Sequence, residues 1–221
     1  MYTIIKRFSD ILLALILTFI LSPIFIVVII TLKFTGEGEI FYLQERVGKK
    51  NKIFKIFKFV TMVKNSPHIG SGIYTSANDS RVLPFGKLLR KTKINELPQI
   101  FNVIIGDMSF VGPRPLIHRT FLLYNNDVQA NIYNSRPGIT GVGSIIFRDE
   151  DQILLKSKLP LEEFYSKHIA PYKGKLEIWY QKNISLMIDL KILFLTAVVI
   201  LKPGTKIIDK ILKNLPSKNT I

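Results

Sequence analysis

The chain has no cysteine among its 221 residues, so disulfide bonds and thiolate metal sites are excluded. This absence fits a reducing compartment. The three histidines, His68, His118 and His168, lie far apart in the sequence and lack the spacing of a zinc site. A P-loop and a dinucleotide-binding glycine pattern are also missing, as are internal repeats and low-complexity tracts. The sequence therefore carries none of the common signatures of zinc, mononucleotide or dinucleotide sites.

Acidic residues are scarce, because 16 Asp and Glu stand against 31 Lys and Arg and give a formal net charge of +15. A chain this basic favours polyanionic partners, namely nucleic acid, anionic lipid headgroups or phosphorylated substrates. Yet 48% of the residues are hydrophobic, which is a high share for a nucleic-acid binder. Basic and aromatic residues alternate between Lys52 and Phe59, but this pattern also fits a strand lying under lipid headgroups. We therefore expect contact with membrane lipids and no binding of nucleic acid.

Residues 11–32 are almost uninterruptedly apolar. As a helix, about 22 residues extend roughly 33 Å, which is enough to cross a bilayer. A signal peptide would have a shorter apolar core and a cleavage pattern of small residues, which the following KFTGEGE lacks. Ser22 and Pro23 lie in the middle of the run. Because proline removes one backbone hydrogen bond and crowds the carbonyl of Phe19, we expect a kink or break there, with the Ser22 hydroxyl bonding a freed carbonyl.

The flanking charges bear on how this helix lies in the membrane. Lys6 and Arg7 precede the apolar run, and five Lys and Arg residues follow it between positions 33 and 52. Both ends therefore look cytoplasmic by the positive-inside tendency. This favours a re-entrant helix that turns at Ser22-Pro23 and leaves on the side it entered, and a kinked transmembrane helix is the alternative.

The rest of the pattern predicts an α+β fold that is mostly helical, with short strands and interfacial amphipathic helices. We divide the chain into a membrane-embedded helix at 1–34, a cytoplasmic domain at 35–202 and a basic amphipathic tail at 203–221. The expected elements are strands at 40–43 and 53–59, a long polar loop at 65–81, a helix from Pro84, a helix at 116–124, an extended segment at 142–147, helices at 162–168 and 176–182, a core or interfacial helix at 184–201, and an amphipathic helix at 206–215 suited to an anionic membrane surface.

The stretch KINELPQIFNVIIGDMSFVGPRP, residues 93–115, is the most informative part of the chain. Asn95 is a good helix N-cap, Glu96 is an acid in the first turn, and Pro98 stands where a missing N–H costs little. Gly106 would end the helix. The positive N-terminus of this helix would attract phosphates, or a metal held between a carboxylate and a phosphate.

Several motifs in this order resemble the bacterial initiating sugar transferases, the small monotopic phosphoglycosyl transferases. They are KRxxD before the apolar run with its central Ser-Pro, KFxTM at 58–62, GKLLRKT, the ELPQIFNVIIGDMSFVGPRP stretch, RPGITG, and SxxxDLKILFLT at 185–196. The resemblance covers nearly the whole chain. It implies a cytoplasm-facing catalytic domain on a re-entrant helix at the bacterial inner membrane. It also implies transfer of a sugar phosphate from a UDP-sugar to undecaprenyl phosphate, with release of UMP and use of Mg²⁺, as the first membrane step of surface glycan assembly.

In that family an Asp-Glu pair supplies the nucleophile and a metal ligand, whereas this chain has Asn95-Glu96. An amide nitrogen is not nucleophilic, so Asn95 cannot form the acyl-phosphate intermediate that an aspartate would form. Asp107 and the pair Asp149-Glu150 are other acids that could be considered. Asp107 is separated from Asn95 by a helix about 15 Å long and more simply caps its turn, and the place of Asp149-Glu150 is open. Direct attack by the lipid phosphate is a further alternative, and so is a catalytically impaired membrane scaffold. Beside the active enzyme and the impaired scaffold, a third possible function is a peripheral lipid-binding protein without sugar chemistry.

The candidate site residues follow from these motifs. Glu96 is the candidate catalytic residue and Mg²⁺ ligand, although a first-turn acid also complements a helix dipole. Asn95 is included by its position. Arg114, stiffened between two prolines, could bind a diphosphate with both arms of its guanidinium, or pair with a carboxylate to stabilise a turn. Other phosphate-binding candidates are Lys58, Arg90 and Arg136, each of which would equally fit a solvated or membrane-facing surface. The sequence leaves open the sugar, the glycan pathway and the formation of a homodimer.

Overall fold

A computed structural model describes residues 1–68, 79–155, 157, 159–205 and 207–217. The chain is mostly helical, with four short strands among the described residues. The helices are α1 (Tyr2–Phe34), α2 (Pro84–Lys91), α3 (Gln99–Ile105), α4 (His118–Phe121), α5 (Asn126–Asn131), α6 (Val142–Ile146), α7 (Glu150–Leu155), α8 (Leu161–Phe164), α9 (Ala170–Lys182), α10 (Leu186–Leu201) and α11 (Ile207–Ile211). The strands are β1 (Phe41–Val47), β2 (Ile53–Phe59), β3 (Ser109–Val111) and β4 (Gly138–Thr140), and the tighter or wider turns are η1 (Lys49–Asn51), η2 (Ser66–His68), η3 (Ile94–Glu96) and the π-helical η4 (Tyr165–Ile169).

The residues form two compact units that alternate along the sequence. Unit 1 comprises residues 1–10, 45–54 and 106–221, and unit 2 comprises residues 11–44 and 55–105. The two units are described separately below.

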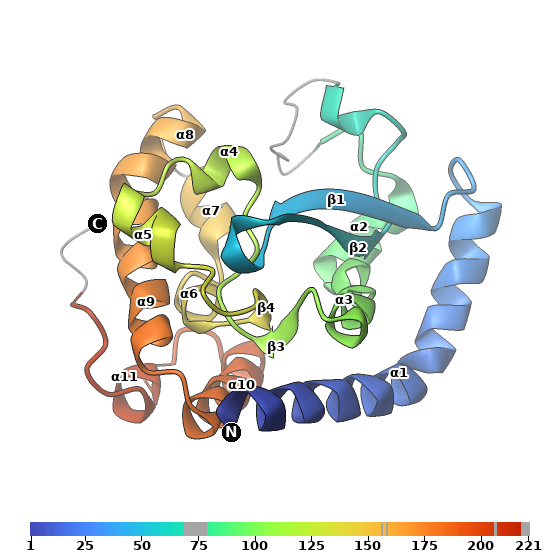
Figure 1. Ribbon diagram of the computed structural model, residues 1–221. Helices are drawn as coiled ribbons and strands as arrows, with labels where there is room; N and C mark the ends of the chain where they lie inside the picture. The colour runs from blue at the N-terminus through green and yellow to red at the C-terminus, as the bar shows by residue number, and fades with distance from the viewer. Residues whose placement is uncertain (69–78, 156, 158, 206, 218–221) are drawn as a thin grey trace. The chain divides into compact units, whose positions relative to one another are not determined.

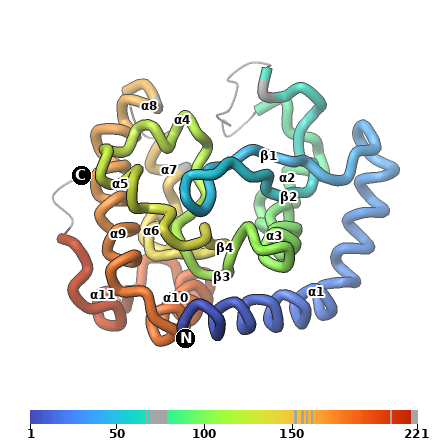
Figure 2. Tube along the Cα trace, viewed as in Figure 1, coloured from blue at the N-terminus to red at the C-terminus, as the bar shows by residue number. Residues whose placement is uncertain are grey.

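Helix α1 runs without interruption through Ser22 and Pro23, so of the expected kink or break the structure shows a kink within one helix. Figure 1 shows this bend, and the Cα trace in Figure 2 follows it. Pro23 is the proline inside the helix, and proline is the usual cause of a sharp kink. The Ser22 hydroxyl donates a hydrogen bond of 2.8 Å to the carbonyl of Phe19, as expected from the sequence. Among the described helices, α1 is the one whose length and composition would allow it to cross a membrane.

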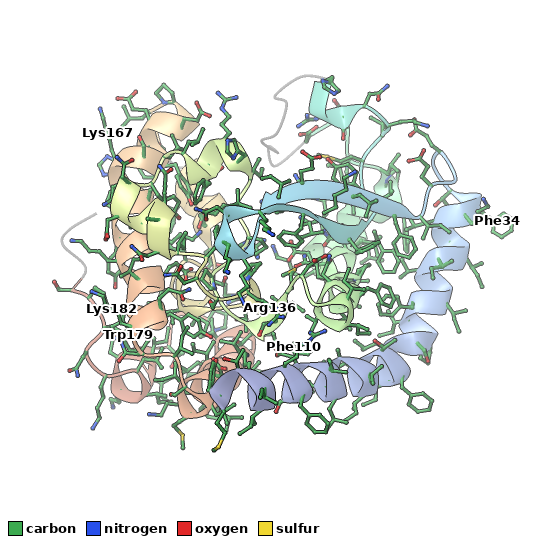
Figure 3. All side chains as sticks on the ribbon, in the orientation of Figure 1. Phe34, Phe110, Arg136, Lys167, Trp179 and Lys182 are labelled. Atoms are coloured by element: carbon green, nitrogen blue, oxygen red, sulfur yellow. The ribbon has the colours of Figure 1, made fainter. Side chains whose placement is uncertain are left out.

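Unit 2 is built around one face of α1. Phe25, Val28 and Leu32 of α1 pack with Phe59 of β2 and Leu89 of α2 in a buried cluster. The ring centroids of Phe25 and Phe59 lie 5.5 Å apart. Other apolar side chains of α1 remain exposed, such as Phe19 and the terminal Phe34, which projects from the end of the helix in Figure 3. A helix with one packed face and a large exposed apolar surface is stable in contact with lipid, because lipid removes that surface from water.

The strands predicted at 40–43 and 53–59 are confirmed as β1 and β2, which pair in a two-stranded sheet. Unit 1 contains the second sheet, in which β3 and β4 are parallel with Ser109 opposite Gly138 and Val111 opposite Thr140. A parallel pair needs a crossover connection, and α4 and α5 lie in it. The expected helix at 116–124 is shorter than predicted and forms only α4.

The prediction of an extended segment at 142–147 is wrong. Residues 142–146 form the helix α6, and the strand β4 precedes them. Helix α6 packs against α9 and α10. Gly143 in α6 lies so close to Glu177 of α9 that an added Cβ would be 2.3 Å from the Glu177 Oε1 atom. Tertiary packing therefore decides the conformation of this segment, and its β-branched residues alone do not.

The C-terminal helices agree with the sequence in part. The helices expected at 176–182 and 184–201 correspond to α9 and α10, and Ser185 caps α10 by accepting the backbone N–H of Ile188. The amphipathic helix expected at 206–215 is shorter, because α11 covers only 207–211 and Lys206 lies outside the described residues. Asn214 has a positive φ of 58°, which cannot continue a right-handed helix.

Candidate functional site

In unit 2, Asn95 lies inside the short turn η3 and is not the N-cap of a helix, so the predicted cap is wrong. The turn begins after Lys93, whose φ of 60° is left-handed, and the following α-helix starts only at Gln99. The Asn95 side chain is 9% exposed, and its Oδ1 atom has no hydrogen-bond partner within the described part of the chain. A buried amide oxygen in this state costs free energy and is available to a donor or a cation.

Glu96 follows in the same turn and faces Lys58 of β2. The Glu96 Oε1 and Lys58 Nζ atoms are 3.7 Å apart, and the two side chains are 23% and 16% exposed. At this distance the attraction is mainly Coulombic, and partial burial strengthens it over an exposed pair. The carboxylate keeps access to solvent and can therefore reach a ligand.

Asn102 of α3 fixes the strand that carries Lys58. Its Oδ1 atom accepts the backbone N–H of Phe57 at 2.9 Å, and its Nδ2 atom donates to the carbonyl of Lys55 at 2.8 Å. The side chain is fully buried. The Asn102 amide thus bonds one backbone N–H and one backbone carbonyl of β2, as a neighbouring strand would do. These two bonds hold β2 against α3. Arg90 belongs to α2, which packs against η3, and its side chain is half-buried.

In unit 1, the backbone of residues 113–116, which includes Arg114, is hydrogen-bonded to residues that come later in the sequence. The Tyr133 hydroxyl donates to the Arg114 carbonyl at 2.8 Å and accepts the N–H of Leu116 at 2.8 Å. The N–H of Gly138 donates to the carbonyl of Pro113 at 2.9 Å. Because the flanking prolines lack N–H groups and fix φ, these bonds leave the segment little freedom.

A buried acidic and basic cluster lies next to this segment. Glu177 of α9 is 2% exposed, and neither of its carboxylate oxygens accepts a hydrogen bond within the described residues, although the backbone amides of Arg114 and Gly143 are near enough to affect its pKa. Burial raises the pKa of Glu177 to about 7, although the charge of Lys173 and the two amides partly lower it. Lys173 is also buried and forms an ion pair with Glu150. Burial lowers the pKa of Lys173, but Tyr165 and Glu150 outweigh this and raise it.

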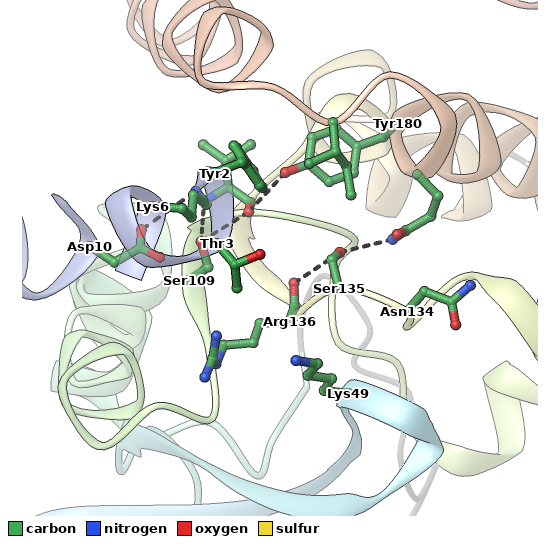
Figure 4. Close-up of a pocket in the computed structure, with 13 residues that line it drawn as sticks. Tyr2, Thr3, Lys6, Asp10, Lys49, Ser109, Asn134, Ser135, Arg136 and Tyr180 are labelled. Carbon is green, nitrogen blue, oxygen red and sulfur yellow. Dashed lines mark hydrogen bonds and ion pairs between the residues drawn. The ribbon is translucent and has the colours of Figure 1, made fainter. Parts of the chain in front are cut away.

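Arg136 lies elsewhere in unit 1, at a polar pocket of about 290 Å³ (Figure 4). Its Nε atom donates to the carbonyl of Gly106 at 2.7 Å. Lys6 in the pocket wall is neutralised by Asp10 at 3.5 Å and by Asp189 at 3.0 Å, whereas Lys49 brings a further positive charge. The pocket can therefore attract anions. Arg136 also bonds the Gly106 carbonyl, so part of its guanidinium is already used within the protein.

A sequence model of the family described as bacterial sugar transferase matches residues 1–203 of the chain. The chain belongs to the bacterial sugar transferase family.

Curated relatives agree with this assignment. The UDP-N-acetylgalactosamine-undecaprenyl-phosphate N-acetylgalactosaminephosphotransferase of Aeromonas hydrophila is 37% identical over 206 residues, covering 90% of this chain and 44% of its own length. The exopolysaccharide production protein ExoY of Sinorhizobium fredii is 35% identical, with 86% and 83% covered. The UDP-glucose:undecaprenyl-phosphate glucose-1-phosphate transferase of Klebsiella pneumoniae is 34% identical, with 87% and 39% covered. The chain thus spans less than half of the Aeromonas and Klebsiella proteins and most of the Sinorhizobium protein.

In this bacterial sugar transferase, unit 2 carries Asn95, Glu96, Lys58 and Arg90, and it brings Lys58 and Glu96 together. Arg114 and Arg136 belong to unit 1.

Sequence reasoning missed three residues that support these groups, namely Asn102, Tyr133 and Glu177. Asn102 and Glu177 are each a single polar residue between apolar neighbours in sequence, which was the available signal, whereas Tyr133 is followed by Asn134 and Ser135 and offers no such signal. Their partners are distant in sequence, so the signal could not name them.

Proposed function

We propose that the chain transfers a sugar 1-phosphate from a UDP-sugar to undecaprenyl phosphate and releases UMP, as the first membrane step in the assembly of a bacterial surface glycan or glycoconjugate. In this reaction a new P–O bond joins the lipid phosphate to the sugar-bearing phosphorus. The bridging P–O bond to UMP breaks, and UMP leaves with the bonding electrons. Family membership and the printed names of the relatives support this reaction.

The observation that carries the proposal is the arrangement of Lys58, Glu96 and Asn95 in unit 2. The Glu96 carboxylate is partly buried and lies 3.7 Å from an ammonium group, and the preceding residue, Asn95, has a buried amide oxygen that lacks a partner among the described residues. Lys58 would neutralise phosphate charge, and Asn95 Oδ1 would accept a hydrogen bond from a donor group on the substrate. Arg114 would bind the diphosphate with its guanidinium.

We also propose Mg²⁺ as the cofactor. Within the described residues, no group of three or more His, Asp or Glu side chains could hold a metal by itself. Mg²⁺ often binds through one or two carboxylates together with substrate phosphates, so the Glu96 carboxylate and the Asn95 amide oxygen fit such a site. When bound there, Mg²⁺ would neutralise charge that develops on the phosphates.

The substitution at position 95 favours direct attack by the lipid phosphate, because an amide cannot form the acyl phosphate. Intact-mass spectrometry after addition of UDP-sugar tests this step. We expect no phosphosugar adduct on the wild-type chain during turnover. An adduct would contradict direct attack, and peptide mapping would then identify the nucleophile.

The overall reaction is tested with the purified chain in detergent or nanodiscs. A panel of UDP-sugars that includes UDP-N-acetylgalactosamine, UDP-glucose and UDP-galactose is mixed with undecaprenyl phosphate and Mg²⁺. We expect UMP release that depends on the lipid phosphate and a matching lipid diphosphate sugar by mass spectrometry. Absence of both products over a broad panel would contradict the proposal.

The alternative is a catalytically impaired membrane scaffold, which Asn95 favours. Asn95→Asp separates the two readings in the same assay. If the wild type is inactive and Asn95→Asp gains UMP release, the scaffold reading is supported. If the wild type is active, it is excluded.

We propose further that α1 is re-entrant and that the catalytic residues face the cytoplasm at the bacterial inner membrane. Because the chain has no cysteine, single cysteines can be introduced at Ile4 and Phe34, both of which are exposed at opposite ends of α1. We expect a membrane-impermeant maleimide to label both positions in inverted inner-membrane vesicles and neither in right-side-out vesicles. Labelling of the two positions from opposite sides would show a spanning helix.

A further inference from the structure

The polar pocket of about 290 Å³ in unit 1 is lined by the first turns of α1, the turn η1, strand β3, the segment before β4 and the end of α9. We propose that this pocket binds a phosphate group, which Lys49 and Arg136 hold. Such a group can be supplied by a phospholipid headgroup or by a soluble phosphate compound. The Asn95-Glu96 turn belongs to the other unit, so this site goes beyond the proposed function.

The end of the pocket at α1 has its charges paired within the protein. The Lys6 Nζ atom lies 3.0 Å from Asp189 Oδ2 and 3.5 Å from Asp10 Oδ1. The hydroxyl groups of Tyr2 and Tyr180 donate to the two carboxylate oxygens of Asp189, each at 2.8 Å. Asp10 and Asp189 are both buried. This end therefore forms a bonded network that needs no ligand.

Lys49 and Arg136 differ from Lys6, because neither pairs with a carboxylate among the described residues. Figure 4 shows both of their charged ends in one part of the pocket, away from Lys6 and Asp10. Arg136 donates through Nε to the Gly106 carbonyl at 2.7 Å, which fixes its guanidinium and leaves the two terminal nitrogens for another acceptor. An arginine fork and a lysine point charge are the two usual means by which proteins hold phosphate.

The charge balance around the pocket also favours an anion. Arg7 adds a further guanidinium near Arg136, since its Nη2 atom would lie 3.2 Å from a Cβ built at Gly106. Two carboxylates, those of Asp10 and Asp189, stand against four cations, namely Lys6, Arg7, Lys49 and Arg136. The excess of two positive charges (4 − 2) equals the charge of a fully ionised phosphate monoester.

The turn η1 holds Lys49 in a fixed place. The next two residues, Lys50 and Asn51, have left-handed φ values of 55° and 58°, which are unfavourable for side chains of these types. The N–H of Lys50 donates to the Tyr133 carbonyl at 2.8 Å, and the Asn51 amide donates to the Gln129 carbonyl at 3.0 Å. Contacts with another segment thus maintain a strained turn, as is common where a side chain must be presented to a ligand.

The segment that carries Arg136 is fixed from α9. The Gln181 amide donates to the Ile132 carbonyl at 2.7 Å and to the Ser135 hydroxyl at 2.9 Å. Both cations are therefore positioned before a ligand arrives, which lowers the entropic cost of binding. The volume of about 290 Å³ corresponds to roughly ten water molecules and lies at the lower end of the range for small-molecule pockets. It suits a phosphate with a short organic group.

Isothermal titration calorimetry of the full chain in dodecyl maltoside tests the site without any need for turnover. The probes are inorganic phosphate, dihexanoyl phosphatidylglycerol, and dihexanoylglycerol, which has the same acyl chains and no phosphate. We expect saturable binding of the two phosphate-bearing probes and none of dihexanoylglycerol. Tighter binding of phosphatidylglycerol than of inorganic phosphate would identify a lipid headgroup as the source, and the reverse order would identify a soluble phosphate. Absence of saturable binding by both phosphate-bearing probes would overturn the proposal.

Substitutions then locate the binding site. Lys49→Gln and Arg136→Gln should each weaken binding of the phosphate probes about tenfold, because each removes a charged hydrogen-bond donor. Lys50→Gln is the matched control, since it makes the same charge change at an exposed residue of the same turn that is not part of the pocket lining. It should weaken binding less than about twofold. Equal weakening by Lys49→Gln and Lys50→Gln would show attraction by net charge alone and would overturn the site.

Two further measurements keep the result decisive. If Arg136→Gln unfolds because it loses the bond to Gly106, Lys49→Gln decides alone, since Lys49 is exposed. Lys58→Gln separates this site from the proposed reaction site in unit 2. If Lys58→Gln abolishes phosphate binding and Lys49→Gln leaves it unchanged, the phosphate binds in unit 2, so the present inference fails while the proposed function is supported.

Discussion

The segment around Arg114 and the turn around Asn95 differ in how strongly the protein fixes them. The backbone of Pro113, Arg114 and Leu116 is bonded to Gly138 and Tyr133, which lie on other parts of unit 1. In the turn of unit 2, Glu96 has Lys58 at 3.7 Å, and Asn95 has a buried oxygen without a partner among the described residues.

This difference separates two tasks. A residue that binds a diphosphate must be held in place before the substrate arrives, since ordering it afterwards would cost affinity. Groups that stabilise the transition state are placed where their free hydrogen-bonding capacity is used only then. The Arg114 segment fits the first task, and the amide oxygen of Asn95 fits the second. The substitutions below should therefore change stability most in unit 1 and activity most in unit 2.

The largest expected effect is on activity, in Glu96→Gln. Loss of the carboxylate removes both the partner of Lys58 and the proposed Mg²⁺ ligand, so we expect kcat to fall about a thousandfold. The unfolding midpoint should change little, because glutamine has nearly the same shape as glutamate and both side chains of the pair keep some access to solvent. The control is Glu39→Gln, which removes an exposed ion pair with Lys64 in the same unit. A large loss of stability in Glu96→Gln with unchanged turnover would reverse the comparison.

The second effect, in Glu177→Gln, is on how stability depends on pH. The wild-type pKa of Glu177 is raised above its ordinary value to about 7, so the folded state binds a proton that the unfolded state has lost over the range from 4.5 to about 7. Its contribution to stability is therefore present at acidic pH and lost as pH rises through neutrality, by roughly 3 kcal/mol at most. Glutamine does not titrate. Denaturant unfolding at pH 5 and pH 8 should show this decline in the wild type and a smaller one in the variant, and equal declines would contradict the assignment.

The third effect is on stability, in Tyr133→Phe. The substitution keeps the ring, which is 1% exposed, and removes the hydroxyl that bonds the Arg114 carbonyl and the Leu116 N–H. Because two backbone groups lose their partner, we expect a loss of roughly 2 kcal/mol in the free energy of unfolding. Tyr42→Phe is a suitable control, since Tyr42 is exposed. An unchanged free energy of unfolding would show that the segment is not fixed by this hydroxyl.

The sequence predicted elements where local pattern and packing agree. Strand β2 was placed correctly because its alternation and flanking turns are local signals. The helix at 142–146 was missed because it is stabilised by packing against α9 and α10, which come later in the sequence. The cap at Asn95 was wrong because a left-handed Lys93 starts a separate turn before the helix. No local propensity predicts such a conformation for lysine.

The candidate site was predicted unevenly for the same reason. Residues within motifs, such as Glu96 and Lys58, could be chosen from the resemblance, and the structure brings these two together. The residues that position them could not be chosen. Asn102 looks like an ordinary polar residue on a helix, and only the three-dimensional arrangement shows that it bonds the backbone of β2 on both sides of Ile56.

The smallest expected effect is the stability change in Asn95→Asp. The new carboxylate would be 9% exposed and adjacent to Glu96, so burial and like charge should raise its pKa, and the attraction of Lys58 should offset part of this. We expect a loss of about 1 kcal/mol at pH 8 that disappears near pH 4, where the carboxyl group is neutral, measured by thermal unfolding at both pH values. A variant more stable than the wild type at pH 8 would mean that the turn already favours a negative charge at position 95. In that case Lys58 would be a better partner for residue 95 than for Glu96, and the unpartnered oxygen at position 95 would result from the amide and not from the surroundings of that position.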